Sequence, residues 1–163
     1  MKIEANYSIK DINSLRINQL AKYFCSIETL EQLLEAIEFS RLKHLPMLFI
    51  GEGSNIVFTK DYDGLVIKNN IFGKIKHDEG TVEISSGENW HNFVDWSLSN
   101  ERYGLENLAL IPGTVGASPI QNIGAYGKEV SAFIKEVKSI NTLTGEERVF
   151  SKEECKFGYR SSV

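Results

Sequence analysis

The chain has 163 residues, of which 42% are hydrophobic and 25% are charged, and its net charge at pH 7 is -4. This is the composition of an ordinary globular protein, long enough to bury a core in one domain or in two small lobes. A net negative charge excludes the general attraction for nucleic acid or anionic membranes that a basic surface would provide. We therefore expect neither of them as a partner.

The N-terminal segment and the two cysteines show no feature typical of an exported protein. The N-terminus lacks the apolar run of a signal peptide, and no segment approaches the ~18 apolar residues of a membrane-spanning helix. Cys25 and Cys155 lie far apart and lack the paired spacing of a metal site. We expect a cytoplasmic protein with two buried free thiols and no metal, in preference to a disulfide.

Two helices are predicted. The first runs from Glu28 to Lys43, because leucine and isoleucine recur in it at helical spacing. Either Ser26 or the capping box Thr29-x-x-Gln32 could begin it. The second covers residues 89–100 and contains His91, which we interpret as a histidine at the surface or at an edge.

Short strands account for most of the remaining chain. Residues 13–17 carry an extended signal, strands are predicted at 47–50, 56–58, 65–67, 71–76 and 81–85, and a hairpin at 134–150 turns at Thr144-Gly145. Few helices among many short strands predict an α+β fold.

A glycine turn follows the first buried strand: Gly51-Glu52-Gly53-Ser54-Asn55. Successive backbone N–H groups in such a turn can surround phosphate oxygens without a lysine. The turn is neither a Walker loop nor a Gly-x-Gly-x-x-Gly fingerprint, because the required residues do not follow. A plain hairpin turn fits the pattern at least as well.

Residues 110–127 form an uncharged segment, Leu-Ile-Pro-Gly-Thr-Val-Gly-Ala-Ser-Pro-Ile-Gln-Asn-Ile-Gly-Ala-Tyr-Gly. Its glycines let the backbone approach a flat ligand, and Pro112 and Pro119 restrict its flexibility. A long surface loop is the alternative, but surface loops usually carry charge. We favour a buried cradle for a large, neutral aromatic ring with polar edges.

Together, three blocks resemble the MurB family of UDP-N-acetylenolpyruvoylglucosamine reductases, in particular its branch in enteric bacteria. The blocks are the glycine turn, the run from Gly104 to Gly127, and Phe157-Gly158-Tyr159-Arg160. Their order and separation match that family over nearly the whole chain. Asn18-Gln19 departs from the family, because a glycine is common there.

The resemblance implies a two-lobed FAD-binding domain of the vanillyl-alcohol-oxidase (PCMH) type, truncated here. The first α+β lobe would span residues 1–70, the second, incomplete lobe 71–163, and the FAD-binding region about 20–163. FAD would be bound non-covalently, since no His or Cys lies in the uncharged segment. The resemblance assigns the pyrophosphate to Gly51, Glu52, Gly53, Ser54 and Asn55, and the flavin and ribityl chain to Pro112, Gly113, Gly116, Ser118, Pro119, Ile120, Gln121, Asn122, Gly124 and Ala125.

The resemblance also implies the reaction. NADPH would reduce FAD, and the reduced flavin would pass a hydride to UDP-N-acetylglucosamine-enolpyruvate, the precursor of UDP-N-acetylmuramate in peptidoglycan synthesis. Tyr159 and Arg160 match the family's catalytic pair, in which the arginine polarises the substrate carboxylate. Judged without the motif, Arg160 would be interpreted as a surface salt-bridge residue. The intact enzyme is expected to be a monomer.

Part of the family's machinery has no counterpart here. The proton-donating serine and its glutamate partner belong to a C-terminal substrate domain, so we expect a fragment or a truncated gene product with weak or absent turnover. The alternative is a non-catalytic flavin- or nucleotide-binding module or relic. A related FAD oxidase ranks lower, because such proteins often tether the flavin through His or Cys.

Overall fold

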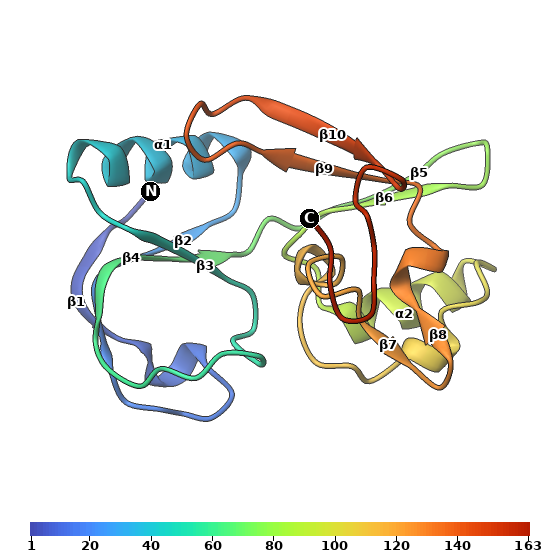
Figure 1. Ribbon diagram of the computed structural model, residues 1–163, viewed down its shortest axis with the longest axis horizontal. Helices are drawn as coiled ribbons and strands as arrows, with labels where there is room; N and C mark the ends of the chain where they lie inside the picture. Colours follow the sequence, from blue (N-terminus) through green and yellow to red (C-terminus); the bar gives the residue numbers. More distant parts are fainter. The chain divides into compact units, whose positions relative to one another are not determined.

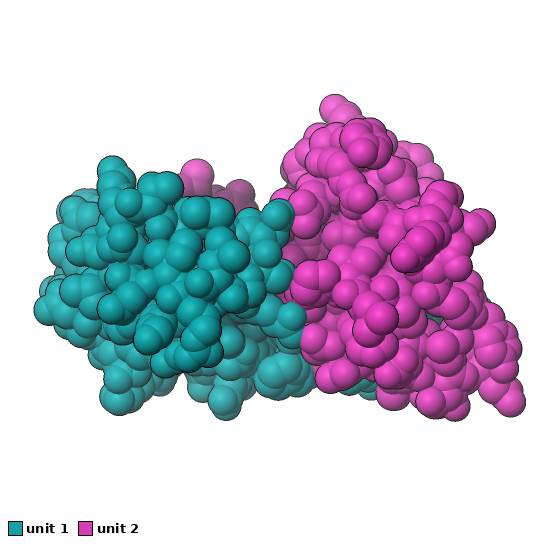
Figure 2. Space-filling model, turned by 90° about the horizontal axis from the view of Figure 1, so that it is seen from below, with its two compact units in different colours: residues 1–87 teal, residues 88–163 magenta.

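The computed structural model describes all residues from 1 to 163 and divides into two compact units, Met1–Gly87 and Glu88–Val163 (Figures 1 and 2). Each unit combines one α-helix with short strands, which confirms the predicted α+β class. The predicted boundary between the two lobes of the FAD-binding domain, at residue 70, stays a prediction.

Unit 1 is built on a four-stranded sheet with the order β1-β2-β4-β3. Its strands are β1 (Glu4–Ser8), β2 (Leu20–Ile27), β3 (Met47–Ile50) and β4 (Tyr62–Asn69). The β1 strand pairs antiparallel with β2, whereas β4 pairs in parallel with both β2 and β3. A hairpin of β5 (Lys74–Lys76) and β6 (Val82–Ile84) follows the sheet.

Both faces of this sheet are buried. Helix α1 (Leu30–Leu42) packs on one face over Cys25, Leu65 and Ile67, and the 3-10 helix η1 (Ile9–Ile12) covers the other (Figure 1). Because β4 is covered on both sides, its central residues form a continuous apolar run instead of alternating. Burial raises the pKa of the Cys25 thiol to about 11, and both cysteines are free and buried.

Helix α1 begins where the capping box predicts. The Thr29 hydroxyl accepts a hydrogen bond from the Gln32 backbone N–H at 3.2 Å, while the Gln32 side chain accepts one from Glu28 N at 2.8 Å. Ser26 instead lies inside β2, so it is not the cap. Satisfying the Gln32 N–H in the first turn of the helix stabilises this start by ~1 kcal/mol.

Two predicted extended segments are wrong. Residues 56–58 form no strand; Phe58 is a core residue, and β4 occupies the position beside β3. Residues 13–17 form a turn and a loop fixed by side-chain hydrogen bonds of Asn13. In the first segment burial of Phe58 takes the place of the predicted strand pairing, and in the second the hydrogen bonds of the Asn13 side chain do so.

Unit 2 contains helix α2 (Trp90–Ser99), a set of 3-10 turns and two hairpins. Strands β9 (Glu136–Ile140) and β10 (Glu147–Ser151) form the predicted hairpin. The second hairpin joins β7 (Gly124–Ala125) to β8 (Lys128–Glu129). The 3-10 turns are η2 (Glu106–Leu108), η3 (Val115–Ala117) and η4 (Val130–Ala132). No helix in the structure has the length and apolar character needed to cross a membrane.

Candidate functional site

The glycine turn (residues 51–55) lies directly after β3 in unit 1. Gly53 has φ +64, a left-handed conformation that glycine adopts without strain. The backbone N–H groups of Gly53 and Ser54 donate no hydrogen bond within the protein. Two free donors beside a left-handed residue can donate to one phosphate oxygen, so the geometry of this turn suits a phosphate group.

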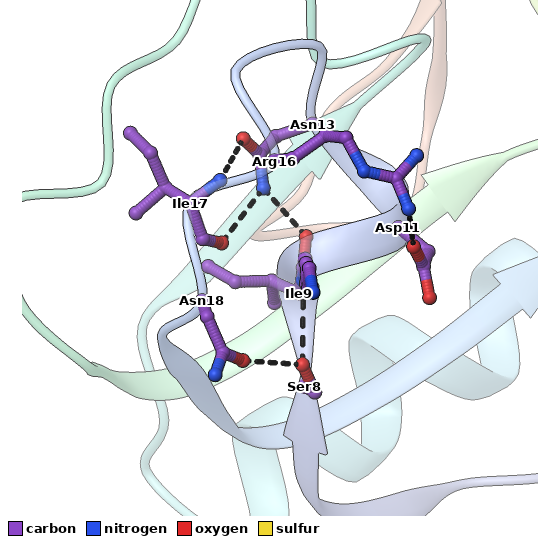
Figure 3. Close-up of polar contacts among 8 residues, drawn as sticks. Ser8, Ile9, Asp11, Asn13, Arg16, Ile17 and Asn18 are labelled. Atoms are coloured by element: carbon purple, nitrogen blue, oxygen red, sulfur yellow. Dashed lines mark hydrogen bonds and ion pairs between the residues drawn. The ribbon is translucent and has the colours of Figure 1, made fainter.

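The turn packs on the loop of residues 9–17, which sequence reasoning missed as part of the site. Figure 3 shows the polar contacts within this loop. A Cβ at Gly53 would lie 2.3 Å from the Ile12 carbonyl oxygen and 2.7 Å from Asn13 Cα. Only glycine permits this contact. Ser14 N also donates to the Gly53 carbonyl oxygen at 3.1 Å.

In unit 2, the N-terminus of α2 holds the start of the uncharged segment (residues 110–127). Asn89 and Thr114 form an isolated antiparallel bridge, Trp90 N donates to Gly113 O at 2.9 Å, and Val115 N donates to Glu88 O at 2.8 Å. These main-chain bonds determine the path of residues 113–115, so a rigid helix positions this part of the segment.

The end of the uncharged segment is a tight hairpin. Tyr126 and Gly127 connect β7 to β8, and both have positive φ, which matches a two-residue turn to the twist of the strands. A Cβ on Gly124 would lie 2.8 Å from the Lys128 carbonyl oxygen, so this position requires glycine. The Gly-Ala-Tyr-Gly sequence is therefore explained by backbone geometry.

Asn122 joins the uncharged segment to the rest of unit 2. Its side chain is 0% exposed; Nδ2 donates to Glu129 Oε2 at 2.9 Å and to Gly158 O at 3.0 Å, and Oδ1 accepts from Ser131 N at 3.1 Å. Both amide N–H donors and the amide oxygen are therefore engaged within the protein. Any contact of Asn122 with a flavin would have to come from its main chain.

Tyr159 and Arg160 occupy the tip of the Tyr-Arg turn (residues 158–161). Gly158 and Ser161 exchange hydrogen bonds across the turn, with N···O distances of 3.0 and 3.3 Å. Arg160 Nη2 donates to the Gly124 carbonyl oxygen at 2.7 Å, and its guanidinium carbon lies 5.9 Å from the Tyr159 ring centroid. The structure therefore brings Arg160 onto the uncharged segment and gives it no carboxylate partner.

Backbone strain gathers in the same place. Four of the nine non-glycine residues with positive φ are Leu110, Asn122, Tyr126 and Arg160. Such conformations cost about 1–3 kcal/mol each and persist where the surroundings enforce them, often at binding sites. The uncharged segment also exposes three large apolar side chains: Leu110, Ile120 and Tyr126 are 76%, 69% and 87% exposed.

The predicted site residues differ in exposure. The cradle is only partly buried, and its exposed positions face solvent with apolar rather than charged groups. Of the candidates, Gly53, Gly113, Ser118 and Asn122 are buried; Gly51, Ser54, Gly116, Pro119, Gln121, Gly124 and Ala125 are half-buried; and Glu52, Asn55, Pro112, Ile120, Tyr159 and Arg160 are exposed. His91 lies at the edge of the segment, where Nδ1 accepts from Leu110 N at 3.4 Å, in agreement with its predicted place.

Comparison with known proteins gives a consistent result. A family described as an FAD binding domain matches residues 21–151. UDP-N-acetylenolpyruvoylglucosamine reductase of Bdellovibrio bacteriovorus is 43% identical over 99% of this chain and 49% of that protein, and the enzyme of the same name from Escherichia coli is 44% identical over 97% and 47%. The chain therefore spans about half the length of the curated relatives that it matches.

A solved structure agrees with the sequence relatives. The crystal structure of UDP-N-acetylenolpyruvylglucosamine reductase (MurB) from Thermus caldophilus superposes with a TM-score of 0.78 at 25% identity, covering 99% of this chain and 57% of that one. The resemblance to the MurB family and the FAD-binding fold that it implied are confirmed. The assignment of individual site residues stays a prediction.

Proposed function

Because the chain belongs to the family of FAD binding domains, we propose that it is the FAD-binding portion of a UDP-N-acetylenolpyruvoylglucosamine reductase. Support comes from relatives of that name, which are 43% and 44% identical over nearly the whole chain. The observation that carries the proposal is Arg160, an exposed guanidinium fixed to the uncharged segment through Gly124 and left without a carboxylate partner.

The residues present fit the proposed cofactor. The N–H groups of Gly53 and Ser54 would donate to the pyrophosphate, and the uncharged segment would line the flavin and ribityl chain. When bound, FAD would supply the redox chemistry, taking a hydride from NADPH and passing it to the enolpyruvyl double bond of the substrate. The protein contributes binding and orientation.

Arg160 would act on the substrate. A guanidinium offers five N–H donors, of which one is given to Gly124 O, so a fork of donors remains for the enolpyruvyl carboxylate. This contact would orient the double bond and stabilise the negative charge that develops as hydride arrives, an effect worth ~2–4 kcal/mol for a preorganised donor. The face of the Tyr159 ring would stabilise the positive charge of the Arg160 guanidinium by a cation–π interaction.

The first test is cofactor binding. The purified chain incubated with FAD is expected to keep a visible flavin spectrum through desalting, and to release unmodified FAD on acid precipitation, because the segment offers no His or Cys for covalent attachment. NADPH added without oxygen is then expected to bleach that spectrum. A chain that retains no FAD would contradict the proposal.

A flavin- or nucleotide-binding module without turnover is the second candidate, favoured by the half-length match to the relatives. The same experiment separates the two. Retained FAD that NADPH does not bleach supports the binding module, whereas bleaching followed by recovery of the oxidised spectrum on adding UDP-N-acetylglucosamine-enolpyruvate supports the reductase.

The role of Arg160 is tested by substrate binding. Titration of UDP-N-acetylglucosamine-enolpyruvate into the FAD-loaded chain is expected to perturb the flavin spectrum, and Arg160→Ala to weaken that binding about tenfold or more by removing a charged hydrogen bond. FAD affinity should be unchanged. The matched control is Arg148→Ala, since Arg148 is exposed but pairs with Glu154 at 3.7 Å. Equal substrate affinity in Arg160→Ala and in the wild type would contradict the assignment.

A further inference from the structure

Asn13 is a buried polar residue with a fully used side chain. It is 5% exposed, and its Nδ2 donates to Ile9 O at 2.6 Å and to Ile17 O at 3.1 Å, while Oδ1 accepts from Ile17 N at 3.0 Å (Figure 3). One amide thus bonds the main chain four residues before it and four residues after it. These bonds hold the loop of residues 9–17 in one conformation.

The glycine turn takes its position from this loop. Gly53 packs so closely on the main chain of Ile12 and Asn13 that no Cβ fits between them. Ser14, the next residue, donates twice to the Gly53 carbonyl oxygen, from N at 3.1 Å and from Oγ at 3.3 Å. A displacement of Asn13 would therefore move the donors that hold this carbonyl.

The orientation of that carbonyl determines the direction of one N–H group. The carbonyl of Gly53 and the N–H of Ser54 belong to the same peptide, and in a planar trans peptide they point in opposite directions. Since Ser14 holds the carbonyl toward the loop, the Ser54 N–H points away from it. This N–H donates no bond within the protein.

We propose that Asn13 is a positioning residue which, through Ser14 and Gly53, aims the Ser54 N–H at the pyrophosphate of FAD. The inference rests on the proposed FAD-binding function and extends it to a residue outside the glycine turn. Asn13 itself lies beneath the turn and has no side-chain donor left for a ligand.

The first measurement needs no cofactor. In amide NMR spectra of the apo protein, Asn13→Ala and Asn13→Asp are expected to shift the Gly53 and Ser54 resonances, while those of the β4 core, Leu65–Ile67, stay in place. Aspartate keeps the volume of the Asn13 side chain and its acceptor oxygen. It places a carboxylate oxygen against the carbonyl oxygens of Ile9 and Ile17, so this variant tests the two N–H donors of Asn13. Ser40→Ala is the matched control, because Ser40 is 1% exposed and its hydroxyl bonds Leu45 O at 2.7 Å, away from the turn.

The second measurement is made with FAD. Both Asn13 variants are expected to raise the dissociation constant of FAD about tenfold, the value of one lost hydrogen bond to a charged group, with Ser40→Ala unchanged. At saturating FAD, the phosphorus resonances of the bound cofactor should shift in the variants while the visible absorption of its flavin ring does not. A merely destabilising substitution would leave both spectra of the saturated protein as in the wild type.

Ser14→Ala covers the case in which an Asn13 variant does not fold, because it removes only the Oγ bond to Gly53. It is expected to shift the Ser54 amide in the same direction by a smaller amount. Unchanged Gly53 and Ser54 resonances in the folded variants, or an unchanged FAD dissociation constant, would overturn the role of Asn13. A wild-type chain that binds no FAD would instead overturn the proposed function, and the apo spectra would still decide whether Asn13 orients the turn.

Discussion

Replacement of Trp90 by alanine is expected to lower the free energy of unfolding by about 3–5 kcal/mol, the cost of removing a large buried aromatic side chain. Trp90 is 2% exposed, packs edge-on against Phe93 at 5.7 Å between ring centroids, and donates from Nε1 to the Leu108 carbonyl oxygen at 2.7 Å. Alanine would leave a cavity and an unpaired buried carbonyl. Urea denaturation followed by circular dichroism measures the loss.

Trp90→Phe is the matched control. Phenylalanine fills most of the volume but cannot donate to Leu108 O, so about 1–2 kcal/mol should be lost instead. Because Trp90 Nε1 bonds Leu108 O, two residues before the uncharged segment, the alanine variant is expected to loosen the start of that segment. A loss below about 1 kcal/mol for Trp90→Ala would show that this helix start is not a core element of unit 2.

Replacement of Asn122 by alanine is expected to cost about 3 kcal/mol of unfolding free energy. It removes three hydrogen bonds made by a side chain that is 0% exposed, which leaves the Ser131 N–H unpaired and the Gly158 carbonyl with its Ser161 N bond alone. It also places an alanine at φ +42, where a Cβ without a local hydrogen bond is strained. The measurement is again chemical denaturation of the apo protein.

Asn122→Gly separates the two contributions. Glycine loses the same hydrogen bonds but adopts positive φ freely, so this variant should be about 1 kcal/mol more stable than Asn122→Ala. Equal stabilities would show that backbone strain contributes nothing at this position. Both variants are expected to release the Tyr-Arg turn, since Asn122 Nδ2 binds Gly158 O, and hence to lower substrate affinity more than FAD affinity.

These two residues show how the structure supports the candidate site. Trp90 and α2 hold residues 113–115 at one end of the uncharged segment, and Asn122 ties the other end to the Tyr-Arg turn. Arg160 then bonds Gly124 directly. A neutral surface next to one fixed cation suits a neutral ring system next to an anionic substrate group.

Local pattern was sufficient for the regular elements. Helices at 30–42 and 90–99 follow from apolar spacing and from caps at Thr29 and Asn89, because helical periodicity and capping depend on residues within one or two turns. The β9–β10 hairpin follows from alternation and from Gly145, which has φ +77. Each of these signals is contained within a short stretch of chain.

Strands without a local signal were missed or misplaced. The β1 strand and most of β2 were not predicted, and residues 56–58 were predicted as a strand that does not form. Whether an apolar run joins a ladder depends on which edge of the sheet is free, and β4, not residues 56–58, pairs with β3. Pairing between distant strands cannot be determined from one strand's own residues.

The sequence by itself determined the chemistry of the candidate site: a glycine turn, an uncharged segment and a Tyr-Arg pair, whose order resembles one flavoenzyme family. Only the tertiary structure decided which groups are available, because availability depends on contacts between residues far apart in the chain. It turned the Asn122 amide inward, left Arg160 without a carboxylate partner, and placed Asn13 beneath a turn forty residues further along the chain. Hydrogen bonds and close packing between such segments have no local pattern from which they could be predicted.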